Sequence, residues 1–254
     1  MARRVVITGV GAVTPLGNDV KTTWESLLEG RSGIETIKSF DASQFETQFA
    51  GELKDFNPHN FMDRKEIKRT DRFVHLAVAA STMALEDSGI EITDPAEQER
   101  FGVIIGSGVG GIETVEVQHL RYLEGGPGRI SPFYVPMMIS DMAAGYVSIH
   151  CKAKGPNFCT VSACASAGHA VAMAFRSIKY GESDFMLTGG TEASVTRLGL
   201  GGFCACKALS KRNDDPQGAS RPFDKTRDGF VLSLIHISEP TRPLYISYAV
   251  FCLK

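Results

Sequence analysis

A chain of 254 residues, 43% of them hydrophobic and 22% charged, is long enough for one large α/β domain or two small ones. Its formal net charge of −2 gives no overall attraction to nucleic acid or to an anionic membrane, so we expect neither as a partner. The six cysteines show no paired zinc-binding spacing or secreted disulfide pattern, and no segment resembles a signal peptide or a membrane span, so we expect a cytoplasmic protein without a metal or other cofactor.

The chain opens with an apolar run at residues 4–8 that predicts a strand. Asn18 or Asp19 can cap a helix that continues to about Leu28. Gly30 follows at the position where helices commonly end. These local signals predict a strand and then a short helix.

Between that strand and helix lies Gly9-x-Gly11, a spacing shared with dinucleotide-binding loops. Thr14 occupies the third position of the fingerprint, and Pro15 interrupts the helix that should follow. The pattern therefore favours a tight structural turn over a nucleotide site.

The middle of the chain alternates helices and strands. Residues 31–60 lack a periodic pattern and predict an irregular, loop-rich segment. Apolar residues at helical spacing predict a long amphipathic helix over 71–88, closed by Gly89. A buried strand is expected over 101–107, and the glycines of 108–111 predict a tight turn after it.

The same alternation continues to about residue 190. A helix is expected over 137–150, after which a short β-rich run leads to Cys164. An Ala-rich helix is expected to start there and to stop at Gly181, and residues 184–190 predict another buried strand. Strands that alternate with helices predict a layered α/β fold.

Cys164 is the main candidate for a reactive group. At an expected strand-to-helix turn, the amides of the helix N-terminus can stabilise a thiolate and an oxyanion. Its neighbours, among them Ala163, Ala165 and Gly168, are small and leave room for a substrate. A buried core thiol is the alternative, and the residues alone leave both interpretations open. His169 lies more than one helical turn away, so we expect it to be structural.

The other cysteines are expected to be structural. Cys159 is predicted to lie within the buried strand before Cys164, and Cys151 at the end of a helix. Cys204 and Cys206 form a Cys-x-Cys pair, but no second ligand cluster supports a metal site there.

A run rich in positive charge over residues 63–72 is either a solvated helix start or a docking surface for an acidic partner. Lys207, Lys211 and Arg212 extend that surface if the fold brings them together. Aromatic residues are not interleaved with these basic residues, which argues against nucleic acid.

Six segments together resemble the beta-ketoacyl-acyl-carrier-protein synthase family, the condensing enzymes of type II fatty acid synthesis. They are residues 5–17, 106–111, 130–136, 162–166, 188–192 and 220–230. The resemblance implies a thiolase-like layered α/β fold of two similar halves, usually in a homodimer. This chain is expected to hold the N-terminal half and to lack most of the second.

The resemblance also implies an acyltransferase reaction. Cys164 matches the cysteine that takes an acyl chain from acyl carrier protein as a thioester, and its amide matches one oxyanion donor. Malonyl-carrier protein then loses carbon dioxide, and the carbanion attacks the thioester to give a longer 3-oxoacyl chain. The family's substrate-binding positions match Val109, Phe133, Tyr134 and Phe203. Its basic carrier-protein docking positions match Lys65, Lys68, Arg69 and Lys207.

The composition changes after Leu232. Residues 233–254 contain no glycine, and the stretch 234–243 resembles translated sequencing-adapter DNA. We therefore expect an incomplete N-terminal ketosynthase domain over 1–232 and a foreign tail over 233–254. The family's decarboxylating histidines belong to its second half, so the chain as written is expected to lack condensing activity.

Three alternative functions stay open. One is a ketosynthase of a polyketide pathway; a chain-length factor of such a pathway typically lacks the cysteine, so Cys164 argues against it. The second is a non-catalytic fragment that binds carrier protein. The third is a nicotinamide oxidoreductase, which the incomplete glycine pattern after the first strand disfavours.

Overall fold

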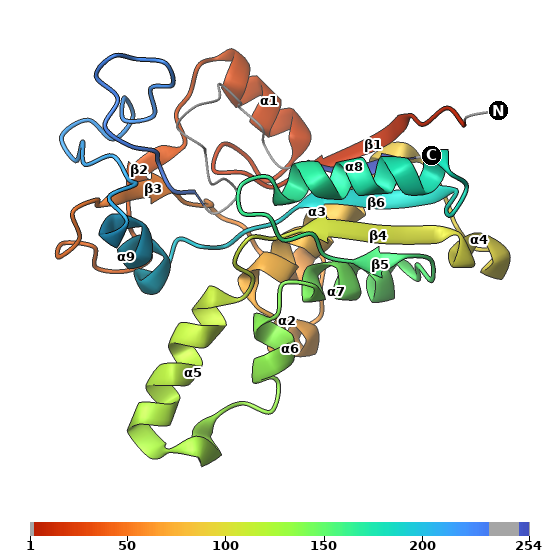
Figure 1. Ribbon diagram of the computed structural model, residues 1–254, viewed down its shortest axis with the longest axis horizontal. Helices are drawn as coiled ribbons and strands as arrows, with labels where there is room; N and C mark the ends of the chain where they lie inside the picture. Colours follow the sequence, from red (N-terminus) through yellow and green to blue (C-terminus); the bar gives the residue numbers. More distant parts are fainter. Residues whose placement is uncertain (1–2, 234–248, 254) are drawn as a thin grey trace.

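A mixed β-sheet forms the centre of the protein (Figure 1). The computed structural model describes residues 3–233 and 249–253. Five strands make up the sheet in the order β1-β7-β6-β4-β5. β4 pairs in parallel with β5 and β6, whereas β7 runs antiparallel to β1 and β6. The strands are β1 (Ile7–Ala12), β4 (Phe101–Gly106), β5 (Asn157–Phe158), β6 (Phe185–Gly190) and β7 (Ala249–Leu253).

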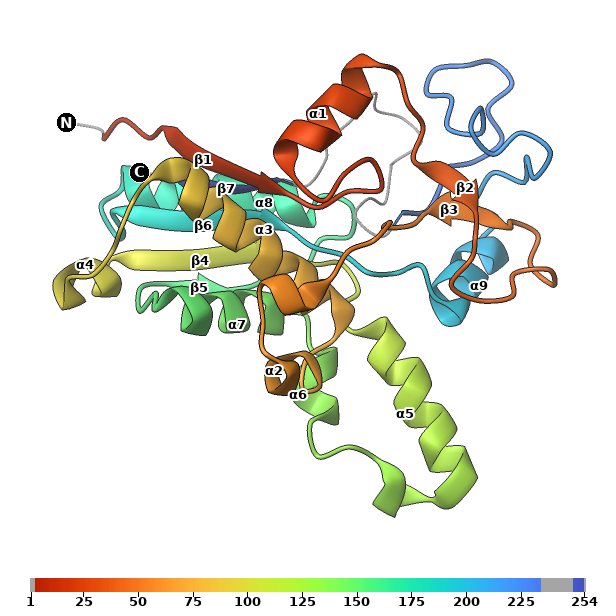
Figure 2. The same cartoon turned by 180° about the vertical axis from the view of Figure 1, so that it is seen from behind.

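Helices cover both faces of this sheet (Figures 1 and 2). Val103 of β4 and Leu187 of β6 belong to the main hydrophobic core, together with residues of α3 and α7. Their neighbours Ile104 and Met186 point to the other face and pack with α8. Because β4 and β6 are buried on both faces, they appear in the sequence as continuous apolar runs. The expected layered α/β fold is confirmed. The helices are α3 (Arg72–Ser88), α7 (Met142–Cys151) and α8 (Ser166–Lys179).

Gly9 and Gly11 lie within β1, so the tight turn expected at these glycines is wrong. The cause is the close packing of β1 on α3. A Cβ atom on Gly9 would lie 2.1 Å from the carbonyl oxygen of Ala84, and one on Gly11 would lie 1.9 Å from that of Ala80. The glycines therefore allow a strand and a helix to touch, and they form no nucleotide loop.

The helices predicted from local capping signals are confirmed. α1 (Val20–Leu28) begins after Asp19, whose side chain accepts a backbone N–H of the first turn. Gly30 follows it with φ of 67°. α3 begins after Asp71 and ends at Gly89, which has φ of 61°.

The segment over residues 31–60 is more ordered than expected, because it contains a separate two-stranded sheet. β2 (Ile34–Thr36) pairs with β3 (Phe49–Gly51), and a 3-10 turn follows at Pro58–Asn60. Strands of three residues are too short to show a periodicity in the sequence. Phe49 packs with Ala219 and Val231, far along the chain.

A helical arm between β4 and β5 also differs from the expectation. The helix predicted over 137–150 is two helices, α6 (Tyr134–Met138) and α7. Before them α5 (Ile112–Gly125) projects from the body of the protein, as Figure 1 shows, and continues into a 3-10 turn at Pro127–Arg129. No side chain caps α5 from its own N-terminus within the described chain. Asp71 accepts the N–H of Thr114 instead, at 2.9 Å, so the capping signal is distant in sequence.

Three more short helices complete the fold: α2 (Arg64–Ile67), α4 (Pro95–Glu99) and α9 (Arg197–Ala205). Within residues 3–233 and 249–253, no helix has both the length and the apolar character that a membrane crossing requires. The expected foreign tail lies largely outside the described residues. Its described part consists of Ser233 and β7, which pairs with two strands of the central sheet.

Candidate active site

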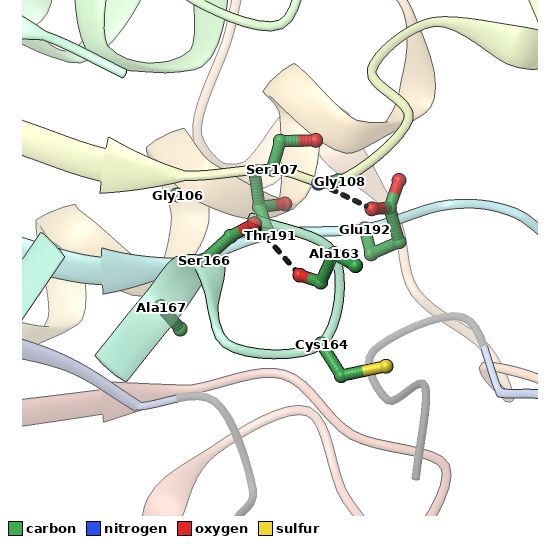
Figure 3. Close-up of a pocket in the computed structure, with 9 residues that line it drawn as sticks. All are labelled: Gly106, Ser107, Gly108, Ala163, Cys164, Ser166, Ala167, Thr191 and Glu192. Atoms are coloured by element: carbon green, nitrogen blue, oxygen red, sulfur yellow. Dashed lines mark hydrogen bonds between the residues drawn. The ribbon is translucent and has the colours of Figure 1, made fainter. Parts of the chain in front are cut away.

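A shallow pocket lies where the carboxyl ends of β4 and β6 meet the N-terminus of α8 (Figure 3). Its empty space, with the open mouth included, is about 250 Å³. Ligands in α/β proteins commonly bind at the carboxyl ends of parallel strands. Nine residues line the pocket: Gly106, Ser107, Gly108, Ala163, Cys164, Ser166, Ala167, Thr191 and Glu192.

Cys164 stands on a tight turn between β5 and α8. β5 ends at Phe158 and α8 begins at Ser166, so the strand is shorter and the helix starts later than expected. Ala163 has φ of 50°, a left-handed conformation that costs on the order of 1 kcal/mol for a residue with a side chain. A strained residue directly before the thiol indicates a turn that surrounding contacts hold in place.

Ser166 supplies those contacts. Its buried hydroxyl accepts the N–H of Ser162 at 2.8 Å and donates to the carbonyl of Ala163 at 2.7 Å. The carbonyl of Ser166 in turn accepts the hydroxyl of Thr160 at 2.7 Å. The turn that carries Cys164 is thus fastened to the first residue of α8.

The N-terminus of α8 makes the pocket favourable for negative charge. No described side chain caps α8, whose N-cap residue is Ala165. Uncapped amides and the helix dipole attract an anion there, either a thiolate or the oxyanion of an attacked carbonyl. Gly106 lets the two elements meet, because a Cβ on it would lie 2.4 Å from the backbone of Ser166. The arrangement therefore suits nucleophilic attack by Cys164.

Cys159 is placed differently from the expectation. It follows β5 rather than lying in it, and its Sγ donates to the carbonyl of Thr160 at 3.4 Å. Burial raises the pKa of the Cys159 thiol, which makes it a poor nucleophile. Cys151 ends α7, as expected. His169 also contacts the turn that carries Cys164, because its Nδ1 lies 2.6 Å from Ser162 Oγ.

Glu192 is a member of the pocket that the sequence did not reveal. It follows β6 by two residues, and its side chain is 5% exposed. Its Oε2 accepts the backbone N–H groups of Gly108 at 2.8 Å and Val109 at 3.1 Å. Burial raises the pKa of the Glu192 carboxyl. The signal in the sequence that could have identified Glu192 is an acidic residue just beyond the carboxyl end of an expected buried strand.

None of the predicted substrate-binding residues is among the nine residues that line the pocket. Val109 follows the lining residue Gly108. Phe133 and Tyr134 lie at the start of α6. Phe203, on α9, makes an edge-to-face contact with Phe230 at a centroid distance of 5.4 Å, and it packs against the same core as Cys164.

The predicted docking residues fall into two groups. Lys65 and Lys68 are exposed at α2, and Arg69 follows them with its guanidinium 4.6 Å from the centre of the Phe133 ring. Lys207 follows α9 and forms an ion pair with Glu46 at 3.0 Å. Both views of the ribbon show α2 and α9 apart, so Lys207 does not extend the patch at α2 (Figures 1 and 2). Within the described ranges, no group of histidine, cysteine and acidic residues could hold a metal ion.

A family model described as "Beta-ketoacyl synthase, N-terminal domain" matches residues 2–233. Among curated proteins, the 3-oxoacyl-[acyl-carrier-protein] synthase 2 of Synechocystis sp. is 51% identical over 230 residues. The enzyme of the same name from Staphylococcus aureus strain N315 is 50% identical over 230 residues. Each match covers 91% of this chain and 55% of the relative, so the chain spans about half the length of these curated relatives.

Solved structures are similar over the whole chain. A beta-ketoacyl synthase from Burkholderia phymatum STM815 has a TM-score of 0.84 and 31% identity, with 59% of that chain covered. A type II polyketide ketosynthase, solved with its acyl-carrier protein and bound to the hexaketide, has a TM-score of 0.80 and 26% identity, with 58% covered. The similarity in sequence and in fold agrees with the resemblance found in the motifs.

Proposed function

This chain belongs to the beta-ketoacyl synthase family, and on that premise we propose that its pocket performs the acyl-accepting step of fatty acid chain elongation. The observation that carries the proposal is the position of Cys164. The thiol lines a pocket at the carboxyl ends of two parallel strands, next to the uncapped N-terminus of α8. The enzyme class is an acyltransferase of the 3-oxoacyl-[acyl-carrier-protein] synthase 2 type.

In the proposed step, the Cys164 thiolate attacks the carbonyl carbon of an acyl thioester carried by acyl carrier protein. A bond forms between the Cys164 sulfur and that carbon, and the bond from the carbon to the carrier's sulfur breaks. The carrier leaves as a thiolate and takes up a proton. The N–H of Cys164 and the N-terminal end of α8 stabilise the tetrahedral oxyanion. This transfer needs no cofactor.

The second step of the proposed reaction uses malonyl-carrier protein. Loss of carbon dioxide leaves a carbanion, which attacks the thioester carbon on Cys164. The new carbon–carbon bond releases Cys164 as a thiolate and gives a 3-oxoacyl chain longer by a two-carbon unit. Decarboxylation belongs to the whole protein, and in the family its histidines lie in the second half of the fold. We therefore assign this chain the acylation step.

The acyl chain is proposed to extend from Cys164 past Val109 and Phe203, with Phe133 and Tyr134 near a partner subunit. Val109 is held next to the pocket wall by the hydrogen bond to Glu192. Phe203 packs on the same core cluster as Cys164. We also propose a cytoplasmic homodimer. Apolar side chains such as Leu120 and Leu123 on α5 are 57% and 65% exposed, and a dimer contact would bury them.

Acyl carrier protein is proposed to dock at α2, where Lys65, Lys68 and Arg69 provide positive charge for an acidic partner. The solved complex of a related ketosynthase with its acyl-carrier protein supports a partner of this kind. Lys207 keeps its proposed role as a second contact, although Glu46 already neutralises part of its charge.

A single assay tests the proposed acylation. The chain is incubated with an acyl-loaded carrier protein, and intact mass spectrometry follows transfer of the acyl group. Wild type and a Cys159→Ala variant are expected to gain one acyl group, which peptide mapping places on Cys164, while Cys164→Ala gains none. Carrier binding without acylation would instead identify a non-catalytic carrier-binding fragment, and acylation at another cysteine would contradict the assignment.

We further propose that the ketosynthase domain ends at Leu232 and that residues 233–254 are a foreign tail. The family match ends at residue 233, which supports this boundary. Re-amplification of the locus past codon 232 tests it. Recovery of the same tail from genomic DNA would overturn the proposal.

A further inference from the structure

Glu192 has no part in the chemistry proposed above, yet it lies in the same pocket as Cys164 (Figure 3). Only one of its two carboxyl oxygens is used. Oε2 accepts the N–H groups of Gly108 and Val109, while Oε1 is buried and has no hydrogen-bond partner among the described residues. The neighbouring Ser194 hydroxyl likewise forms no hydrogen bond to a described residue, and its proximity to the carboxyl offsets only part of the rise in the Glu192 pKa that burial causes.

Such an arrangement is unfavourable for stability by itself. No described lysine, arginine or histidine forms an ion pair with Glu192. A buried acid without a cation and with one unsatisfied oxygen destabilises the folded state, because water would solvate both oxygens. A group retained at such a cost needs an explanation at its site.

The explanation lies in the two segments that Glu192 joins. The turn at Gly108 and Val109 follows β4, and Glu192 follows β6. Gly108 is close both to the carboxyl and to the turn that carries Cys164. A Cβ on Gly108 would be 3.1 Å from Glu192 Oε2 and 3.5 Å from the carbonyl oxygen of Ala163.

We propose that Glu192 is a positioning residue that holds the Gly108–Val109 turn against the Cys164 turn and so sets the width of the pocket beside the thiol. This inference rests on the proposed function, because it takes the pocket beside Cys164 to be the site that binds the acyl group. Without the two hydrogen bonds, this turn can move away from Ala163, and bulky reagents gain access to Cys164 relative to small ones.

The test compares how fast a small and a bulky thiol reagent, iodoacetamide and N-phenylmaleimide, modify Cys164, with rates read from the Cys164 peptide by mass spectrometry. Glu192→Ala is expected to raise the bulky-to-small rate ratio by about tenfold, since it removes both hydrogen bonds that hold the Gly108–Val109 turn. Glu192→Gln keeps a carbonyl oxygen that can accept both N–H groups, and it is expected to stay near the wild-type ratio.

The matched control is Asp184→Ala, at the opposite end of the same strand. Asp184 precedes β6 and forms ion pairs with Arg3 and Arg100, far from the lining residues. The Asp184→Ala variant is expected to have a lower melting temperature and an unchanged bulky-to-small rate ratio. An unchanged ratio in Glu192→Ala, an equal change in Asp184→Ala, or a Gln variant that behaves like Ala would each overturn the proposal. Alkylation requires no carrier protein, so this result is independent of the acylation assay.

Discussion

The guanidinium carbon of Arg69 lies 4.6 Å from the centre of the Phe133 ring. Arg69 is a proposed docking residue, and Phe133 begins the segment proposed to reach the acyl chain of a partner subunit. The contact is a cation–π interaction, which is worth on the order of 0.5–1 kcal/mol at exposed sites. It places the carrier-binding patch in direct contact with α6, so events at the two sites can affect each other.

From this contact we predict that Arg69 and Phe133 act together in carrier binding. Arg69→Ala should weaken the affinity for acyl carrier protein several-fold, because it removes a charge from the patch at α2. Phe133→Ala should also weaken it, because the ring fixes the guanidinium. The two effects should be non-additive by about 0.5–1 kcal/mol in a double-mutant cycle measured by calorimetry.

Lys65 provides the control for that cycle. It is exposed on α2, so Lys65→Ala combined with Phe133→Ala is expected to give additive losses. Additivity in the Arg69–Phe133 pair as well would show that the ring does not orient the guanidinium.

The second prediction concerns the glycines of β1. Gly11→Ala should destabilise the protein by about 2 kcal/mol or more, because its Cβ would lie 1.9 Å from the carbonyl oxygen of Ala80 on α3. Gly202→Ala on α9 has open space around the new Cβ and should be neutral or raise stability by about 0.5–1 kcal/mol. Urea denaturation of both variants measures the difference, and equal stabilities would contradict the packing of β1 on α3.

The third prediction concerns Ser166, which fastens the Cys164 turn. Ser166→Ala removes the acceptor for Ser162 and the donor to Ala163, and it should slow acylation of Cys164 by about tenfold. Ser177→Ala, near the other end of α8, removes a buried hydroxyl contact to Ser183 at 3.0 Å. It should lower the melting temperature without an effect on acylation. A similar loss of acylation in both variants would mean that α8 stability alone governs the thiol.

The fourth prediction concerns His75 and acid. Burial lowers the pKa of the His75 side chain to about 4, from its usual value of 6.5. The folded state therefore keeps His75 neutral where the unfolded chain binds a proton. Above pH 6.5 the imidazole is neutral in both states, and the full free energy of unfolding is kept. As the pH falls from 6.5 towards 4, protonation of the unfolded chain lowers the free energy of unfolding by up to about 3 kcal/mol.

Denaturant unfolding of wild type and His75→Gln between pH 7.5 and 4 measures this effect. The groups that face the imidazole are the carbonyl of Ile67 and the hydroxyl of Thr70, with the charge of Arg72 nearby. The variant should lose less stability than wild type over this range. Parallel pH profiles for the two proteins would rule out His75 as the source.

The sequence predicted those elements whose signals are local. Asp19, Asp71, Gly30 and Gly89 mark the ends of α1 and α3, and the structure has these helices where the caps placed them. α5 was missed because its capping acid, Asp71, stands far earlier in the chain. Gly9 and Gly11 of β1 were wrongly predicted to form a turn for a related reason. They are needed for close packing against α3, which is distant in the sequence.

In the candidate site, too, the residue with local signals was predicted and the residue that depends on distant contacts was not. Cys164 was found from its small neighbours and from the motifs around it, all within a few residues. Glu192 belongs to one of those motifs, but its significance depends on Gly108 and Val109, which precede it by more than 80 residues. A single sequence does not display such a pairing, because backbone N–H groups leave no mark in the side-chain pattern.

β7 (Ala249–Leu253) lies within the proposed foreign tail, and in a chain translated with that tail its position has a consequence for the order of folding. It pairs residue 7 with residue 253 and separates β1 from β6. During synthesis, β1 emerges first and has no hydrogen-bonded partner in this sheet until β7 has left the ribosome. Pairings so distant in sequence form slowly, because closing the long intervening loop costs conformational entropy before any stabilising contact forms. The nascent chain therefore carries an unpaired strand edge throughout translation, when it is most exposed to aggregation and to chaperones.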